Sequence, residues 1–252
     1  MTGFAHKLKG SSKCWLDAAL DFIYPPVCQI CGGRRCGALE GYVCADCWIK
    51  GVRFIKAPFC DRCGLPYQGE ITISFDCSNC REMDLQFRYA RSAVVAGGTV
   101  LEVIHRYKYN RALWFEPFLA DVLVRQAEPL LNQERWDMMI PVPLHPVKQR
   151  EREFNQAERL AAPLSRALKI PLRSDILRRT TETRTQTLLS RSERAANVRH
   201  AFALKTSDSL RGLKIIVFDD VLTTGATTSA CARELRAAGA EDVCVWTVAR
   251  GL

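Results

Sequence analysis

Four pairs of cysteines in the first third of the chain restrict its fold more than any other feature. Each pair has the form C-x2-C, and the eight residues are Cys28, Cys31, Cys44, Cys47, Cys60, Cys63, Cys77 and Cys80. Twelve or thirteen residues separate successive pairs, which is the spacing of a four-thiolate zinc site. The sequence therefore predicts two structural Zn²⁺ ions on these thiolates. The spacing leaves open whether the pairs combine in chain order or interleave.

The zinc could have a structural role or could support binding of a partner. A region this short cannot bury a sufficient core, so zinc would hold it together, and eight thiolates leave no open coordination position for chemistry. Basic and aromatic residues such as Arg34, Tyr42 and Trp48 interleave here, so contact with nucleic acid or protein is the alternative. No role is assigned to the four remaining cysteines, which are Cys14, Cys36, Cys231 and Cys244.

The apolar residues of the 252-residue chain form no run of about 18 that could span a membrane. The first residues contain Lys7 and Lys9 without the apolar centre of a secretory signal. Thiolates that bind metal are typical of a reducing compartment. We therefore expect a cytoplasmic protein that does not insert into membranes.

The net charge of +9 is concentrated in one region. Residues 148–199 contain thirteen Lys or Arg and six Asp or Glu, a local balance of +7. A charge run of this kind is either a solvated helix face or a site for phosphates or nucleic acid.

Beyond the cysteines, the hydrophobic pattern alternates between strands and helices. The pattern predicts strands at 89–97, 138–142, 214–218 and 242–249, and helices at 99–107, 112–131, 154–168 and 226–238. Strands that alternate with helices at this spacing favour a parallel α/β sheet. We expect three parts: an N-terminal helix in residues 1–25, a zinc-binding domain in 26–85 and an α/β domain in 86–252.

A candidate phosphate-binding loop follows the predicted strand at 214–218. The strand delivers Asp219 and Asp220 at its carboxyl end, and Thr223, Thr224, Gly225, Ala226 and Thr227 lead into a helix. Backbone N–H groups at a helix N-terminus favour phosphate, and the glycine allows close approach of the backbone. Two adjacent carboxylates suit ribose hydroxyls, or Mg²⁺ through water.

This order of an apolar run, two acids and Thr-Thr-Gly-x-Thr resembles the binding motif of type I phosphoribosyltransferases. The resemblance implies a parallel sheet with flanking helices that binds 5-phosphoribosyl-1-pyrophosphate (PRPP) with Mg²⁺. It implies that Asp219 and Asp220 hold the ribose hydroxyls and that Thr223 to Thr227 surround the 5′-phosphate. Members that act on 6-oxopurines have an Asp where this chain has Thr223, which argues against hypoxanthine or guanine salvage.

Further motifs in the middle of the chain narrow the resemblance. Ile140-Pro141-Val142-Pro143-Leu144 precedes Arg150, Arg152, Phe154, Asn155 and Gln156, and Thr185-Gln186 follows. With Tyr107-Lys108-Tyr109, the cysteine pairs and the phosphate loop, this order resembles the ComF family, which is linked to DNA uptake in natural competence and to DNA utilisation. It implies that Val142, Pro143, Arg150, Arg152 and Gln186 serve the pyrophosphate or a lid formed by residues 180–190. The family usually has Gly where this chain has Glu153.

Two functions remain open at this point. The first is an enzyme that transfers a phosphoribosyl group from PRPP to an unknown acceptor, by positioning and electrostatics, since the motif contains no obvious general base. The second is a module without turnover that binds single-stranded DNA or partner proteins through the zinc fingers and a basic cleft. DNA-uptake or helicase proteins are the partners that the resemblance suggests.

Overall fold

The computed structural model describes residues 26–67, 69, 77–81, 83–181, 198, 200–206 and 208–252. Three features of the sequence lie outside these residues, namely the helix expected at 11–23, Cys14 and Gln186.

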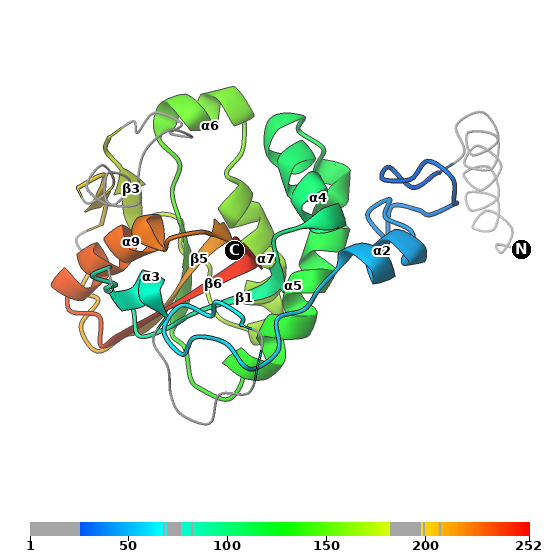
Figure 1. The fold of residues 1–252 in the computed structure, drawn as a ribbon. Helices are drawn as coiled ribbons and strands as arrows, with labels where there is room; N and C mark the ends of the chain where they lie inside the picture. Colours follow the sequence, from blue (N-terminus) through cyan, green and yellow to red (C-terminus); the bar gives the residue numbers. More distant parts are fainter. Residues whose placement is uncertain are drawn as a thin grey trace, which may run out of the picture.

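A parallel sheet forms the centre of the described molecule (Figure 1). Its strands are β1 (Ala90–Val95), β2 (Met138–Pro141), β5 (Lys214–Leu222) and β6 (Asp242–Arg250), in the order β1-β6-β5-β2. All three pairings are parallel, so the carboxyl ends of the four strands meet at the same edge. Ligands of open α/β sheets bind at this edge.

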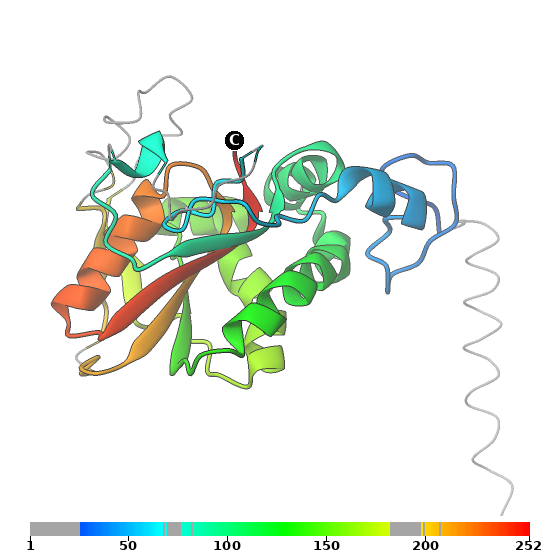
Figure 2. The same ribbon diagram turned by 60° about the horizontal axis from the view of Figure 1, so that its bottom comes forward.

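Helices cover both faces of the sheet (Figure 2). One face packs against α4 (Gly98–Tyr109), α5 (Glu116–Leu131) and α7 (Gln156–Leu168), and the other packs against α9 (Ala226–Ala237). A 3-10 turn, η1 (Leu113–Phe115), precedes α5, and the short helix α6 (Pro146–Arg152) follows β2. The pattern did not predict α6, whereas α4, α5, α7 and α9 lie within a few residues of their expected positions.

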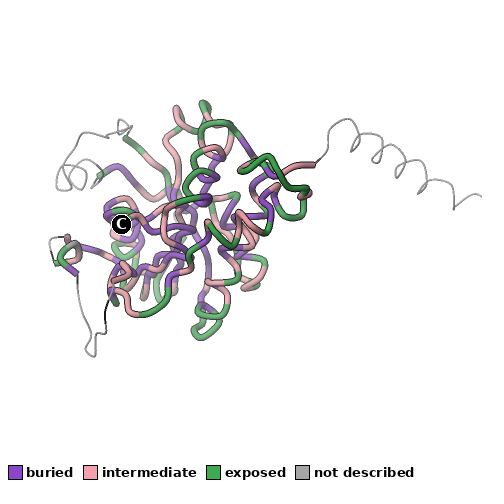
Figure 3. The backbone as a smooth tube through the Cα atoms, turned by 45° about the vertical axis from the view of Figure 1, so that its right-hand side comes forward, coloured by how far each residue is buried: buried purple, intermediate pink, exposed green. Residues whose placement is uncertain are grey.

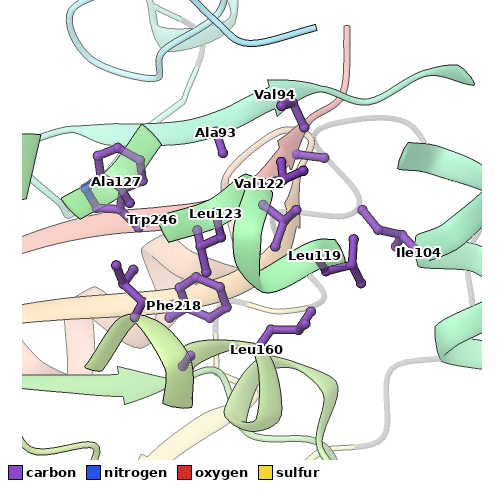
Figure 4. Packing of buried hydrophobic residues seen from close by; sticks show 14 of the residues in the cluster. Ala93, Val94, Ile104, Leu119, Val122, Leu123, Ala127, Leu160, Phe218 and Trp246 are labelled. Atoms are coloured by element: carbon purple, nitrogen blue, oxygen red, sulfur yellow. The ribbon is translucent and has the colours of Figure 1, made fainter. Parts of the chain in front are cut away.

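Alternate residues of the central strands point to opposite faces. Ile216 and Phe218 of β5 belong to the core beneath α5 and α7, whereas Ile215 and Val217 belong to the core beneath α9. Figure 4 shows Phe218 beside Trp246 of β6, with leucines of α5 and α7 packed on them. Burial on both faces explains why these strands are continuous apolar runs, and Figure 3 shows the buried segments gathered at the centre.

A two-stranded antiparallel hairpin lies on the α9 side of the sheet. It consists of β3 (Leu177–Arg179) and β4 (Phe202–Leu204), and Leu177 and Phe202 are buried in the same cluster as residues of α9. Residues 182–190, which belong to the expected lid, lie outside the described part of the chain.

The two cysteine units pack against different parts of the α/β body. The first, with α2 (Ala45–Gly51), lies beside α4, where Thr99 Oγ1 donates to the carbonyl of Cys47 at 3.2 Å. The second, with α3 (Ser78–Arg81), meets β1, where the N–H of Ala90 donates to the carbonyl of Arg62 at 2.7 Å. The segment between the units pairs antiparallel with β1, so it covers this edge strand.

The predicted fold class is confirmed: a parallel sheet with flanking helices follows two cysteine clusters. The domain boundaries at residues 25/26 and 85/86 stay a prediction. No helix in the described ranges is both long and apolar enough to cross a membrane.

We predict that Gly51→Ala destabilises the protein by about 1–3 kcal/mol, because overpacking a close contact has a cost of this order. A Cβ at Gly51 would lie 2.1 Å from Thr99 Oγ1 and 2.4 Å from Thr99 Cβ. Urea unfolding followed by circular dichroism measures the change. Gly33→Ala is the matched control, since its Cβ would meet only the Cys31 carbonyl, at 3.8 Å. Equal stability of the two variants would contradict the close packing of the first unit on α4.

Candidate functional site

Two acids stand near the carboxyl end of β5, as predicted, and a lysine from α4 reaches them. Asp220 is 4% exposed, and its Oδ2 lies 2.6 Å from Lys108 Nζ. Asp219 Oδ1 accepts a hydrogen bond from the N–H of Asp220 at 2.9 Å. The C-terminal turn of α4 therefore brings a cation to the end of the central strand, where it balances one carboxylate.

Burial and the neighbouring charges alter the titration of this trio. Burial, and then the negative charge of Asp220, raise the pKa of Asp219 to about 7, although Lys108 opposes the shift. Burial alone would lower the pKa of Lys108, but the carboxylates of Asp220 and Asp219 outweigh it and raise that pKa. Lys108 is therefore a cation near neutral pH, whereas Asp219 is close to its midpoint.

The loop after β5 enters α9 through a glycine in the left-handed conformation. Gly225 has φ 86° and directly precedes the first residue of α9, a conformation that favours glycine. Thr224 Oγ1 accepts from the N–H of Ala226 at 3.3 Å, and Thr228 Oγ1 donates to the carbonyl of Gly225 at 3.1 Å. Hydroxyls thus fix the loop at the positive end of the helix dipole.

A cavity of about 700 Å³ opens over these groups at the carboxyl edge of the sheet. Seven predicted site residues line it, namely Asp219, Asp220, Thr223, Thr227, Val142, Pro143 and Arg152. Thr224, Gly225 and Ala226 form the buried part of the same loop. Arg150, a pyrophosphate candidate, is not among the lining residues, although its neighbours Glu151 and Arg152 are. Gln186 lies outside the described residues.

Sequence reasoning assigned no site role to several residues that line the cavity. Among them are the cations Lys108, Arg111, Lys148 and Arg179. Lys108 belongs to the Tyr107-Lys108-Tyr109 motif, but Asp220 lies 112 positions further along the chain. No local sequence pattern indicates that the two side chains meet. Arg179 comes from β3 of the hairpin, and only the three-dimensional structure brings it to the cavity.

The segment between β2 and α7 holds one wall of the cavity. Asn155 caps α7 by accepting from the N–H of Ala157 at 3.0 Å, and its Nδ2 donates to the carbonyl of Val142 at 3.1 Å. Glu153 has φ 68° at the end of α6, so it occupies the left-handed conformation that glycine adopts without strain. The glycine usual in the ComF family would adopt this conformation without strain, and Glu153 adopts it here.

The eight predicted metal ligands gather in two groups, and the partition that the spacing left open is sequential. The sulfur atoms of Cys28, Cys31, Cys44 and Cys47 lie within 4.8 Å of one another, as do those of Cys60, Cys63, Cys77 and Cys80. Four sulfurs at such separations fit a tetrahedral zinc site. Burial, and then the charge of Cys28, raise the pKa of Cys36 to about 12.

The acids at the end of β5 are the candidate ligands for Mg²⁺ in the cavity. Their oxygens are of the type that Mg²⁺ prefers, but Asp220 is engaged by Lys108. Asp219 is therefore the carboxylate that would face a magnesium ion carried by a phosphate ligand.

Comparison with known proteins gives matches to both parts of the chain. Residues 19–82 match the model of the double zinc ribbon domain. Competence protein F of Haemophilus influenzae is 32% identical over 88% of this chain and 96% of its own length. DNA utilization protein YhgH of Shigella flexneri is 30% identical over 90% of this chain and 98% of its own length. A purine phosphoribosyltransferase structure from Pyrococcus horikoshii is 17% identical, with a TM-score of 0.33 over 53% of this chain and 83% of its own.

We predict that the purified protein binds two zinc ions and that Cys31→Ser and Cys63→Ser each lose one of them on dialysis against a chelator. Each substitution removes one of four thiolates from a separate cluster, and incomplete sites bind the metal weakly. Elemental analysis by mass spectrometry measures the stoichiometry. Loss of both ions from either single variant would contradict two independent sites.

Proposed function

We propose a function for this chain from its family, because it belongs to the family of competence protein F and DNA utilization protein YhgH. We infer that it binds PRPP with Mg²⁺ in the cavity at the carboxyl edge of the sheet, and that it acts in DNA uptake or DNA utilisation. The observation that carries the proposal is the meeting of two carboxylates, a threonine-rich loop and five lysine or arginine residues around one cavity.

Each part of a ribose phosphate has a matching group. The 5′-phosphate would lie on the loop of Thr223 to Thr227, where helix N–H groups and hydroxyls donate. The ribose hydroxyls would donate to Asp219, and Asp220 would share them to the extent that Lys108 leaves an oxygen available. A pyrophosphate would extend toward Val142, Pro143 and the guanidinium of Arg152, which can donate a pair of hydrogen bonds.

Magnesium would supply positive charge between the pyrophosphate oxygens when it is bound with the ligand. The chain's own contribution is to orient the ribose and to surround it. These residues support ligand binding more directly than catalysis. If a transfer reaction occurs, its acceptor would enter from the open side of the cavity.

A second candidate is binding of single-stranded DNA at the mouth of the same cavity. Lys148, Arg111 and Arg152 lie there beside Tyr109, which is 56% exposed and has the Arg152 guanidinium 5.2 Å from its ring centroid. Cations that track phosphates, next to an exposed ring on which a base can stack, are the usual elements of such sites. PRPP would occupy the floor of the cavity and DNA the rim, and the two ligands would share the guanidinium of Arg152.

We predict that Asp219→Asn lowers the affinity for PRPP with Mg²⁺ at least about tenfold, since a hydrogen bond to a charged group is worth about 1.5–3 kcal/mol. Isothermal titration calorimetry of the zinc-loaded protein measures it. Asn keeps the oxygen that accepts from the N–H of Asp220, so this variant is preferable to one at Asp220, which would leave Lys108 without its 2.6 Å partner. Asp121→Asn on α5, paired with Arg125 on the surface, is the matched control.

Failure of the native protein to bind PRPP would overturn the proposed ligand. The same samples are then titrated with single-stranded DNA over a range of salt concentrations. A steep loss of affinity with salt that is equal in native protein and Asp219→Asn would assign the rim to DNA, whereas salt-insensitive or absent binding would remove that candidate.

We predict that the affinity for PRPP rises about tenfold between pH 6 and pH 8, as expected for an acid that must be ionised to bind and that titrates near pH 7. The pKa of Asp219 is raised to about 7 by burial and by Asp220, so the binding form is scarce at pH 6 and dominant at pH 8. Ligand phosphates titrate as well, so the comparison is with Asp219→Asn. A variant that keeps the full pH dependence of the native protein would contradict the assignment.

A further inference from the structure

Arg250, the last residue of β6, has a buried charge that the proposed ligand site does not use. Its side chain is 2% exposed, and a guanidinium removed from water needs acceptors for its N–H groups. The acceptors come from two segments that are far apart in the sequence. One is the second cysteine cluster, and the other is the start of the phosphate loop.

On one side, Arg250 contacts a predicted zinc ligand. Its Nε lies 3.3 Å from the carbonyl oxygen of Cys63, and its Nη2 lies 3.6 Å from the Cys63 sulfur. Four thiolates around a divalent zinc leave a net negative charge on the site, and a guanidinium close to one of the sulfurs is attracted to it. A filled second cluster therefore favours the observed position of the Arg250 side chain.

On the other side, Arg250 holds the backbone from which the phosphate loop begins. Its Nη1 donates to the carbonyl of Leu222 at 3.0 Å, to that of Thr223 at 2.5 Å and to that of Gly251 at 2.5 Å. The N–H of Gly251 donates to the same Leu222 carbonyl at 2.8 Å. One side chain therefore joins the carbonyls of residues 222 and 223 to the second cluster.

A second contact joins the same two regions. Ser229 of α9 donates through Oγ to the carbonyl of Asp84 at 3.1 Å and accepts from the N–H of Gln86 at 2.9 Å. A Cβ at Gly225 would lie 3.4 Å from Leu85 and from Phe87. The chain leaving the second cluster thus packs on the loop directly, whereas the first unit contacts the α/β body at α4 and α5.

We propose that Arg250 is a positioning residue through which zinc in the second cluster holds the ribose-phosphate loop in its binding geometry. The proposal rests on the proposed function for the identity of the ligand. Coupling between two sites is reciprocal, so zinc in the second cluster strengthens PRPP binding and PRPP strengthens retention of that zinc by the same factor. The first cluster is outside this coupling.

The test is an equilibrium competition for zinc between the protein and a chelator, with and without PRPP and Mg²⁺. In the native protein we expect PRPP to raise the affinity for one of the two zinc ions about tenfold, a typical size for such coupling. Arg250→Lys keeps the charge but loses the fork of donors. We expect it to retain two zinc ions and lose the effect of PRPP on zinc affinity. An equal effect in native protein and variant, or no effect in a native protein that binds PRPP, would overturn the proposal.

A matched pair of cluster variants tests the same coupling without ligand. Cys80→Ser opens the second cluster and Cys47→Ser opens the corresponding position of the first, and each of these cysteines is half-buried. We expect faster amide exchange at residues 222–228 in Cys80→Ser alone, and recovery in Cys80→His, which restores a zinc ligand. Because this exchange measurement uses no PRPP, it tests the coupling even if PRPP is not the ligand. Equal exchange in Cys80→Ser and Cys47→Ser would overturn the coupling.

Discussion

The ion pair between Lys108 and Asp220 is the interaction on which the arrangement of the site depends. The central strand β5 ends in two adjacent acids, and Asp220 is almost fully buried. An unpaired buried carboxylate is costly, and it becomes tolerable only with a close cation and further hydrogen bonds. Lys108 meets this requirement from the last turn of α4. The pairing therefore fixes α4 against the carboxyl edge of the sheet. Both acids line the cavity, and Asp219 is the one that this ion pair does not engage.

The two cysteine clusters have similar ligand spacing but different surroundings. Val43 and Val52 beside the first cluster belong to the large core that includes α4 and α5. The second cluster forms a small core of its own, in which Cys60, Cys63 and Cys77 are the buried members. A core of this size cannot order a polypeptide without additional cross-links. The second unit therefore depends on its metal, and this same unit touches the loop of the ligand site.

Local patterns in the sequence predicted the parts of the structure that local interactions determine. The strand, acid pair and loop from Lys214 to Thr227 were readable because buried strand, turn glycine and helix start are consecutive, and the C-x2-C pairs were readable because ligand spacing is local. The sequence did not predict the hairpin of β3 and β4, the helix α6, or the partners of Lys108 and Arg250. The hairpin and the two sets of partners depend on contacts between distant segments, whereas α6 is a short helix that begins with the His145 cap and Pro146. Glu153 shows the reverse case, because the fold imposes a left-handed backbone where the residue type does not favour it.

The charges around the cavity are arranged in two tiers that respond differently to an incoming phosphate. Lys108 and Asp220 form a pair whose side chains are 18% and 5% exposed, and separating such a pair would leave a buried charge without a partner. The ion pairs Lys148–Glu151 and Arg111–Glu153 have side chains that are 32% to 65% exposed. Ion pairs this exposed contribute only about 0–1 kcal/mol to stability. A phosphate can therefore recruit the outer cations at small cost while the inner pair keeps its geometry. The inner tier positions Asp219 and the loop, and the outer tier supplies the positive charge that attracts and retains an anionic ligand.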